Sequence, residues 1–295
     1  MNEPLFRGCC CALATPFDPL GEVDYGALGR MIDFQLDNGT AALAVCATTG
    51  EGATLSEREF EGIVSFAAQR VCGRVPVIAG AGKNCTRTTL RLSRLARKNG
   101  ADGLLLVTPY YNKSSQAGLA EHFERVADGV EIPIIIYNVP GRTGMTVAPE
   151  TYGRLSTHPN IRGVKEASGD LSLIARAVKA CGGRLDYYSG NDEQTLAVLA
   201  LGGKGVISTT ANIAPAQMAE ICTRWEKGDI EGARRAQLDL LELIDAMFIE
   251  TNPIPLKYAL GKMGLCGDKV RLPLVAPSEG SKKRIDGALE KFGLI

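Results

Sequence analysis

Lys165 ends an apolar segment, residues 161–165, and a turn-rich stretch follows it directly. The segment has the composition of a buried strand. Burial penalises an ammonium and favours the neutral amine, which is the form that attacks a carbonyl carbon to give a Schiff base. A strand-end lysine also has a plainer interpretation, in which its stem lies along the sheet and its ammonium reaches solvent. The local pattern leaves both interpretations open.

Tyr137 ends a second segment of the same kind. Three consecutive isoleucines, Ile134-Ile135-Ile136, precede Tyr137 and Asn138. Schiff-base chemistry needs a group that delivers and removes protons, and a tyrosine hydroxyl is one such group. The two segments therefore suggest a lysine nucleophile with a tyrosine acid/base.

Composition excludes several classes of function. The chain has 295 residues, 45% of them hydrophobic, and its 33 basic residues balance 33 acidic ones without a charged block, so nothing favours nucleic acid or an anionic membrane surface. No apolar stretch approaches the roughly 20 residues of a membrane span. Residues 1–7 lack the order of a secretory signal, so we expect a cytoplasmic protein.

The cysteines and histidines do not form a metal site. Nine cysteines are scattered without a C-x-x-C, three of them adjacent at Cys9, Cys10 and Cys11, and the only histidines are His122 and His158. A zinc site needs clustered ligands, so we expect the cysteines to be small buried hydrophobes. We predict a protein that uses neither a metal nor a cofactor.

Strand-like and helix-like segments alternate along the chain. Eight strand-like segments cover residues 8–14, 41–47, 75–79, 103–107, 133–137, 161–165, 184–189 and 205–208. The helical patterns between and after them cover residues 24–38, 56–71, 86–99, 116–130, 148–156, 171–180, 192–201 and 215–227. Strict alternation predicts a parallel sheet, and eight units favour a closed (β/α)8 TIM barrel, an α/β fold, over an open sheet. The G-x-G-x-x-G fingerprint of a dinucleotide-binding sheet is absent after the first strand.

The chain continues beyond the eighth unit. We assign residues 1–227 to a catalytic barrel and residues 228–295 to a C-terminal helical region. Within the latter we predict one long amphipathic helix over residues 230–249, a turn at Asn252-Pro253-Ile254-Pro255 and further helical segments.

Barrel enzymes place their sites at the C-terminal ends of the strands. In this chain those ends carry the hydroxyl and cationic side chains of Thr48, Thr49, Tyr111, Tyr137, Arg142 and Lys165, and Gly190 and Ile207 mark the ends of the last two strands. Tyr137 and Lys165 end neighbouring strands about 4.8 Å apart, so the phenol can reach an imine carbon. This position favours the catalytic interpretation of Lys165 over the solvent-exposed one.

Several short motifs follow one another along the chain, and their order and spacing together are stronger evidence for a family than any single motif. They are Thr48-Thr49-Gly50-Glu51, Ala79-Gly80-Ala81-Gly82, Thr108-Pro109-Tyr110-Tyr111-Asn112, Tyr137-Asn138-Val139-Pro140-Gly141-Arg142-Thr143-Gly144, Gly163-Val164-Lys165-Glu166-Ala167-Ser168-Gly169-Asp170, Ser189-Gly190-Asn191-Asp192 and Asn252-Pro253-Ile254-Pro255-Leu256-Lys257. Together they resemble the dihydrodipicolinate synthase / N-acetylneuraminate lyase family of pyruvate-dependent class I aldolases, over nearly the whole chain.

The resemblance implies roles for the residues at the strand ends. Lys165 would form the imine with pyruvate, and Tyr137 would be the proton donor. Thr48 and Tyr111 would complete a hydroxyl relay, with Tyr111 lent by a neighbouring subunit of a homotetramer built as a dimer of dimers. The pyruvate carboxylate would be held by the backbone around Thr49 and Ile207, with Gly190 in the same set of substrate-binding residues.

Within the family the chain looks like the members that condense pyruvate with aspartate semialdehyde to 4-hydroxy-tetrahydrodipicolinate, in lysine and diaminopimelate biosynthesis. Arg142 carries this choice, because a guanidinium can grip the carboxylate of the second substrate, whereas sialic acid presents a polyhydroxylated chain. The plainer alternatives are that Arg142 is a surface arginine in a turn and that Glu51 is a solvated charge in a loop. Two other functions stay open: another pyruvate aldolase, such as N-acetylneuraminate lyase or a keto-deoxy sugar acid aldolase, and a non-catalytic ligand-binding barrel.

The resemblance also bears on feedback inhibition by lysine. The positions that match the inhibitory pocket of sensitive family members are Gly52, Ala53, Glu57, Phe60, Asn84, Thr88 and Tyr110. Thr88 stands where those members have an acidic residue and cannot pair with an incoming ammonium. We therefore expect weak or absent inhibition by lysine.

Overall fold

A computed structural model describes residues 3–295 of the chain, and its centre is a closed barrel of parallel strands. Each strand pairs with the next in the chain, and the eighth pairs with the first. The strands are β1 (Gly8–Ala12), β2 (Ala42–Val45), β3 (Val77–Gly80), β4 (Gly103–Val107), β5 (Ile134–Asn138), β6 (Ile161–Glu166), β7 (Asp186–Ser189) and β8 (Gly205–Ser208). The predicted (β/α)8 TIM barrel is confirmed.

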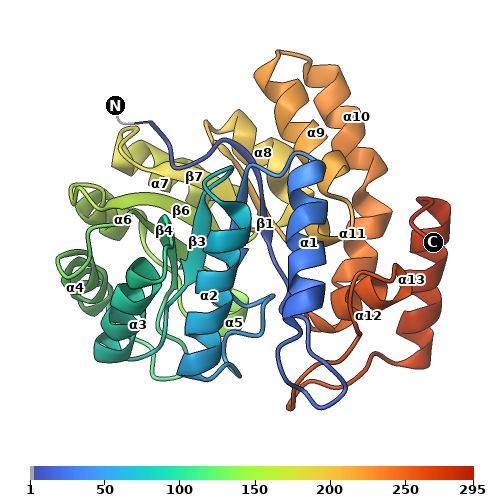
Figure 1. The fold of residues 1–295 in the computed structure, drawn as a ribbon. Helices are drawn as coiled ribbons and strands as arrows, with labels where there is room; N and C mark the ends of the chain where they lie inside the picture. The colour runs from blue at the N-terminus through green and yellow to red at the C-terminus, as the bar shows by residue number, and fades with distance from the viewer. Residues whose placement is uncertain (1–2) are drawn as a thin grey trace.

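Helices surround the barrel, as Figure 1 shows. Those between the strands are α1 (Tyr25–Asp37), α2 (Glu57–Val71), α3 (Thr86–Lys98), α4 (Gln116–Ala127), α5 (Pro140–Thr143), α6 (Pro149–Leu155), α7 (Leu171–Cys181) and α8 (Thr195–Ala200), with a short 3-10 turn, Asp192–Gln194, before α8. A second 3-10 turn, Thr210–Asn212, and α9 (Pro215–Glu226) follow β8. The C-terminal helices are α10 (Ile230–Asp239), α11 (Leu241–Met247), α12 (Ile254–Lys262) and α13 (Glu279–Lys291).

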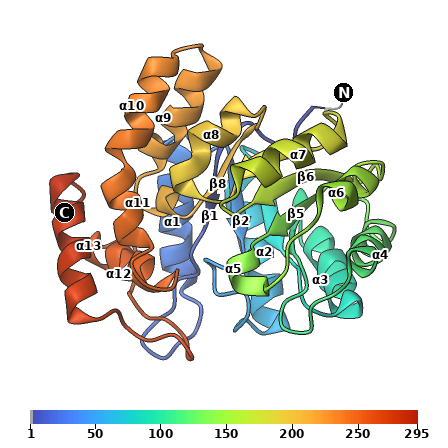
Figure 2. The same ribbon diagram turned by 180° about the vertical axis from the view of Figure 1, so that it is seen from behind.

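The C-terminal helices lie on the side of the barrel formed by α1, away from α3 and α4, in both views (Figures 1 and 2). Helix α13 packs against α11 and α12. The C-terminal helical region predicted from the sequence is therefore present. The division of the chain at residues 227 and 228 stays a prediction.

Helix starts follow local capping chemistry. The side chains of Asp24, Ser115 and Asp170 each accept a hydrogen bond from a backbone N–H in the first turn of α1, α4 and α7. Ser56 and Glu59 form a reciprocal capping box at the start of α2. These caps satisfy N–H groups that have no partner within the helix, which is why the predicted starts of these four helices fall within a residue of the observed ones.

The core has two layers, which follow from the alternation of side chains along each strand. Cys9 and Cys11 point to the larger layer between the strands and the helices, and Cys10 points into the barrel. The barrel interior holds small residues such as Ala42 and Ala44, and its base is closed by Phe6 stacked on Tyr188 with ring centroids 4.2 Å apart. The expectation that the nine cysteines are buried is confirmed for seven of them and is wrong for Cys72 and Cys85, which are exposed.

Two predicted elements of the C-terminal region are wrong in detail. The single helix over residues 230–249 is divided, because the N–H of Leu240 donates to the carbonyl of Leu238 and the hydrogen-bond ladder breaks there. The predicted turn at residues 252–255 ends early, since α12 begins at Ile254 with Pro255 in its first turn. Proline lacks a backbone N–H and is tolerated there because an N–H in the first turn of a helix has no partner within the helix.

Within residues 3–295, no helix is long and apolar enough to cross a membrane. In the same residues, no three histidine, cysteine, aspartate or glutamate side chains lie close enough to hold a metal ion.

Candidate active site

Lys165 and Tyr137 lie side by side at the ends of β6 and β5. The register of the two strands pairs them directly, and the Lys165 Nζ atom lies 4.5 Å from the centroid of the Tyr137 ring. Lys165 is 4% exposed and Tyr137 7% exposed. The alternative interpretation of Lys165, with its ammonium in solvent, is therefore wrong. A buried amine beside a phenol is an arrangement suited to Schiff-base chemistry.

Asn138 and Glu166 form a second pair on the other face of the same two strand ends. The Asn138 Nδ2 atom donates to both carboxylate oxygens of Glu166, at 2.9 and 3.1 Å. The Tyr152 hydroxyl and the Ser168 N–H also donate to this carboxylate. Burial raises the pKa of Glu166, and these hydrogen bonds oppose the rise. The pair ties together the residues that directly follow Tyr137 and Lys165.

A cavity of about 310 Å³ opens at this end of the barrel. Thr48, Tyr137 and Arg142 contribute to its wall, together with Lys83 and Asn252. Lys165 does not belong to the wall; its Nζ atom lies 4.5 Å from the ring centroid of Tyr137, which does. The volume suits a small substrate.

Arg142 lies in α5, directly after β5, and its side chain is exposed at the cavity wall. One N–H of its guanidinium donates to the carbonyl of Asn252 at 3.0 Å. Since a guanidinium has five N–H donors, four others stay available to an incoming carboxylate. The interpretation of Arg142 as a plain surface residue does not account for its place in the wall.

Thr49 is buried and lies in a small polar cluster. Its hydroxyl accepts a hydrogen bond from Asn252 Nδ2 at 3.0 Å and lies 3.3 Å from the hydroxyl of Thr209. Ile207, on β8, is fully buried among the residues that fill the barrel. Neither residue forms part of the cavity wall. Their contact with a substrate carboxylate stays a prediction.

Gly190 lies outside the cavity wall, and packing alone accounts for a glycine there. A Cβ atom on Gly190 would come within 2.7 Å of the Ala167 side chain, and its N–H donates to the carbonyl of Glu166 at 2.7 Å. Its expected role in substrate binding stays a prediction.

Tyr111 is the one expected catalytic residue that points away from the site. It is 92% exposed, has a φ of 70° and does not contribute to the cavity wall. Thr48, Tyr137 and Arg142 therefore line one cavity and Lys165 lies beside Tyr137, whereas Tyr111 does not join them within this chain.

Four buried polar residues near the site were given no role in the sequence analysis: Asn138, Glu166, Asn252 and Lys257. Each lies beside a residue or motif that was recognised. Lys257 carried a usable signal, since it interrupts an apolar run that extends from Ile254 to Leu260. The partners of the other three become known only with the fold.

The fold and the site define a (β/α)8 enzyme with a buried lysine and a tyrosine at the mouth of its barrel. Residues 5–292 match the dihydrodipicolinate synthetase family. The chain is 48% identical to the 4-hydroxy-tetrahydrodipicolinate synthase of Geobacter sulfurreducens, over 99% of this chain and 100% of that protein. The chain belongs to the dihydrodipicolinate synthetase family.

Solved structures agree with this assignment. The dihydrodipicolinate synthase of Thermotoga maritima superimposes with a TM-score of 0.97 at 43% identity, covering 99% of this chain and 100% of that chain. The chloride-inhibited enzyme of Acinetobacter baumannii, solved in complex with pyruvate, gives a TM-score of 0.96 at 39% identity, over 98% and 99% of the two chains. The expected activity, that of a 4-hydroxy-tetrahydrodipicolinate synthase in lysine biosynthesis, is confirmed.

Proposed function

We propose that the protein condenses pyruvate with aspartate semialdehyde through a Schiff base on Lys165. The observation that carries this proposal is the buried side chain of Lys165, whose Nζ atom lies 4.5 Å from the ring centroid of Tyr137. Pyruvate bound to the related Acinetobacter baumannii enzyme supports the first substrate. A cytoplasmic location is part of the proposal.

The chemistry begins when the neutral Lys165 amine attacks the ketone carbon of pyruvate and water leaves. The protonated imine then withdraws electrons, so a proton leaves the pyruvate methyl group and an enamine forms. The enamine carbon attacks the aldehyde of the second substrate. The amino group of that substrate finally displaces Lys165 from the imine carbon, which closes the ring and frees the enzyme.

Tyr137 is the group that moves protons in these steps. Tyr137 belongs to the cavity wall, and the strand register brings it beside Lys165. Thr48 and Tyr111 would extend the proton path as a hydroxyl relay, since hydroxyl groups both donate and accept. Such a relay needs no histidine.

Two carboxylates have to be held during the reaction. We assign the pyruvate carboxylate to the backbone around Thr49 and Ile207, with Gly190 nearby, and the carboxylate of aspartate semialdehyde to Arg142. The exposed guanidinium at the cavity wall supports the second assignment, because it can bind an incoming anion bidentately.

The exposed position of Tyr111 supports a shared site in a homotetramer built as a dimer of dimers. A tyrosine that is 92% exposed in one chain can reach the cavity of a neighbour. Mixing inactive Lys165→Ala chains with inactive Tyr111→Phe chains should then restore part of the activity. No recovery, despite proven subunit exchange, would show that each site is built from one chain.

A panel of aldehydes offered with pyruvate tests the substrate assignment. Aspartate semialdehyde should be turned over faster than sugar aldehydes of similar size. Cleavage of N-acetylneuraminate that is faster than condensation of aspartate semialdehyde would contradict the assignment.

A further inference from the structure

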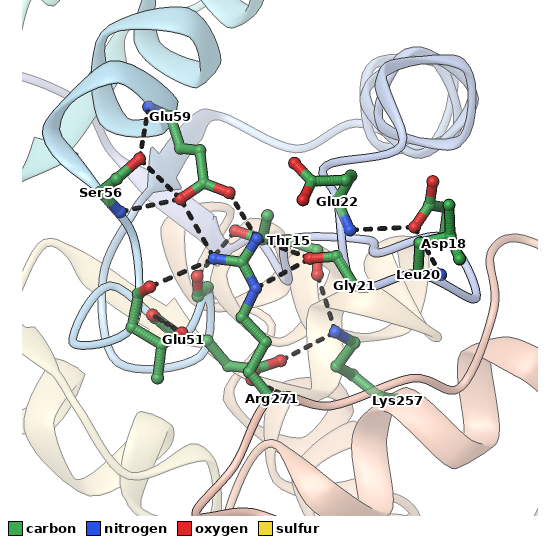
Figure 3. Close-up of polar contacts among 12 residues, drawn as sticks. Thr15, Asp18, Leu20, Gly21, Glu22, Glu51, Ser56, Glu59, Lys257 and Arg271 are labelled. Atoms are coloured by element: carbon green, nitrogen blue, oxygen red, sulfur yellow. Dashed lines mark hydrogen bonds and ion pairs between the residues drawn. The ribbon is translucent and has the colours of Figure 1, made fainter.

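Lys257 and Glu51 form an ion pair that is almost completely buried (Figure 3). The Lys257 Nζ atom lies 2.8 Å from Glu51 Oε1, and the two side chains are 0% and 1% exposed, so the interpretation of Glu51 as a solvated loop charge is wrong. The same ammonium donates to the carbonyl of Thr15 at 2.9 Å and lies 4.1 Å from the centroid of the Phe17 ring. Lys257 belongs to α12, in the C-terminal region, and Glu51 to the loop after β2.

The second oxygen of Glu51 is also bound to the C-terminal region. Glu51 Oε2 accepts a hydrogen bond from the backbone N–H of Arg271 at 2.9 Å. The Arg271 guanidinium in turn donates to the carbonyls of Gly21 and Thr54 and pairs with Glu59 (Figure 3). One carboxylate in the barrel loop thus binds both α12 and the segment at Arg271 that follows it.

Stability does not account for this arrangement. Taking two charges out of water costs several kcal/mol for each ion, and apolar side chains of similar volume often stabilise a fold as well or better. Glu51 also has a φ of 51°, in the left-handed region that costs a residue other than glycine roughly 1–3 kcal/mol. Costly features of this kind cluster where geometry matters for function.

The loop that contains Glu51 also contains Thr48 and Thr49. The Thr15 hydroxyl donates to the carbonyl of Gly50 at 2.7 Å, so Thr15 holds the loop through Gly50 and holds Lys257 through its own carbonyl. Asn252, just before α12, donates to the Thr49 hydroxyl. Three consecutive residues of the loop, 49 to 51, are thereby fixed by hydrogen bonds to residues outside it.

From this geometry we infer that Glu51 and Lys257 are positioning residues, through which α12 sets the place of Thr48 and Thr49 for pyruvate. The C-terminal region is then part of the catalytic apparatus. The inference rests on the proposed function, because it needs these threonines to act on pyruvate.

The test compares Lys257→Met with Lys262→Met. Both substitutions remove an ammonium from α12, but Lys262 is 41% exposed and pairs at the surface with Asp286. Lys257→Met should lower the melting temperature and reduce kcat/KM for pyruvate by about 10- to 100-fold, since a misplacement of about 1 Å can cost 10²-fold. Lys262→Met should behave like the wild type.

A double variant, Glu51→Gln with Lys257→Met, separates positioning from folding. It removes both charges, so it leaves no uncompensated buried ion, and it keeps an acceptor for the Arg271 N–H. We expect the melting temperature to recover and kcat/KM for pyruvate to stay about 10-fold or more below that of the wild type. Recovery of both quantities, or unchanged pyruvate kinetics in folded Lys257→Met, would overturn the inference.

The wild type distinguishes this inference from the proposed function. If borohydride traps no pyruvate on the wild type, the proposed function fails. If the wild type is trapped normally and the variants match its kinetics, only the positioning role fails.

Discussion

Replacing Glu166 by glutamine should damage the Lys165–Tyr137 pair without touching either residue. The carboxylate of Glu166 accepts hydrogen bonds only, two from Asn138 Nδ2 and one each from Tyr152 and Ser168. A glutamine has one oxygen and one NH₂ group, so its NH₂ group must occupy a position where the carboxylate oxygen now accepts from donors. The Ser168 N–H cannot change its role, but the Tyr152 hydroxyl can turn and accept. The NH₂ group is therefore expected at the Oε2 position, where it loses its bond to Asn138.

The lost bond sets the expected magnitude. A hydrogen bond to a charged group contributes about 1.5–3 kcal/mol, so we expect Glu166→Gln to lower the free energy of unfolding by that amount. The pair holds the ends of β5 and β6 in register, so Tyr137 and Lys165 should also shift. A misplacement of about 1 Å can cost 10²-fold, and we expect kcat to fall by about 10- to 100-fold.

The assay combines urea unfolding with steady-state kinetics. The exchange variant, Asn138→Asp with Glu166→Gln, again places an amide opposite a carboxylate and should recover much of both quantities. Tyr187→Phe is the matched control, because it removes a buried hydroxyl that bonds to Cys181 and not to Glu166. Wild-type turnover in Glu166→Gln, or an exchange variant no better than the single variant, would refute the reasoning.

Four further results are expected. Tyr137→Phe should slow turnover by roughly 10²- to 10⁴-fold with the fold intact, and a smaller loss in kcat would argue against its acid/base role. Arg142→Ala should raise KM for aspartate semialdehyde far more than KM for pyruvate, because it removes a charge-assisted contact that contributes about 1.5–3 kcal/mol to binding of the aldehyde. Equal effects on the two KM values would contradict the assignment. Burial lowers the pKa of His122 to about 4, so as the pH falls the unfolded state takes up a proton before the folded state does, and the fold loses stability. His122→Gln should therefore reduce the loss of stability measured between about pH 6.5 and pH 4. Lysine should inhibit weakly or not at all, because Thr88 offers no charge and Glu57 is already in an ion pair; half-inhibition below about 1 mM at subsaturating pyruvate would show otherwise.

The barrel could be predicted because its signals are local. The isoleucines of β5 and the capping box of α2 each specify an element within a few residues. The ends of the strands and helices were predicted less accurately. The segment over residues 41–47 shortens to β2 (Ala42–Val45), because Cys46 takes a φ of 57° and leaves the strand. The break at Leu240 likewise depends on packing that periodicity does not record.

The part of the site that lies at the C-terminal ends of the barrel strands could be predicted. Once the strands were known, their C-terminal ends had to meet, and this brought Lys165 and Tyr137 together. Contacts between distant residues could not be foreseen. Lys257 and Glu51 are 206 residues apart in the sequence, and only the folded chain shows that they meet. Tyr111 lies outside the cavity wall of its own chain, so its proposed role would need a second subunit, which no pattern within one chain describes.

Borohydride trapping of pyruvate on the wild-type protein, followed by peptide mass spectrometry, tests the central claim most directly. We predict that the reduced pyruvyl group is found on Lys165, the buried lysine beside Tyr137, and that Lys165→Ala forms no adduct. An adduct on any other lysine, or none on the wild type, would contradict the account.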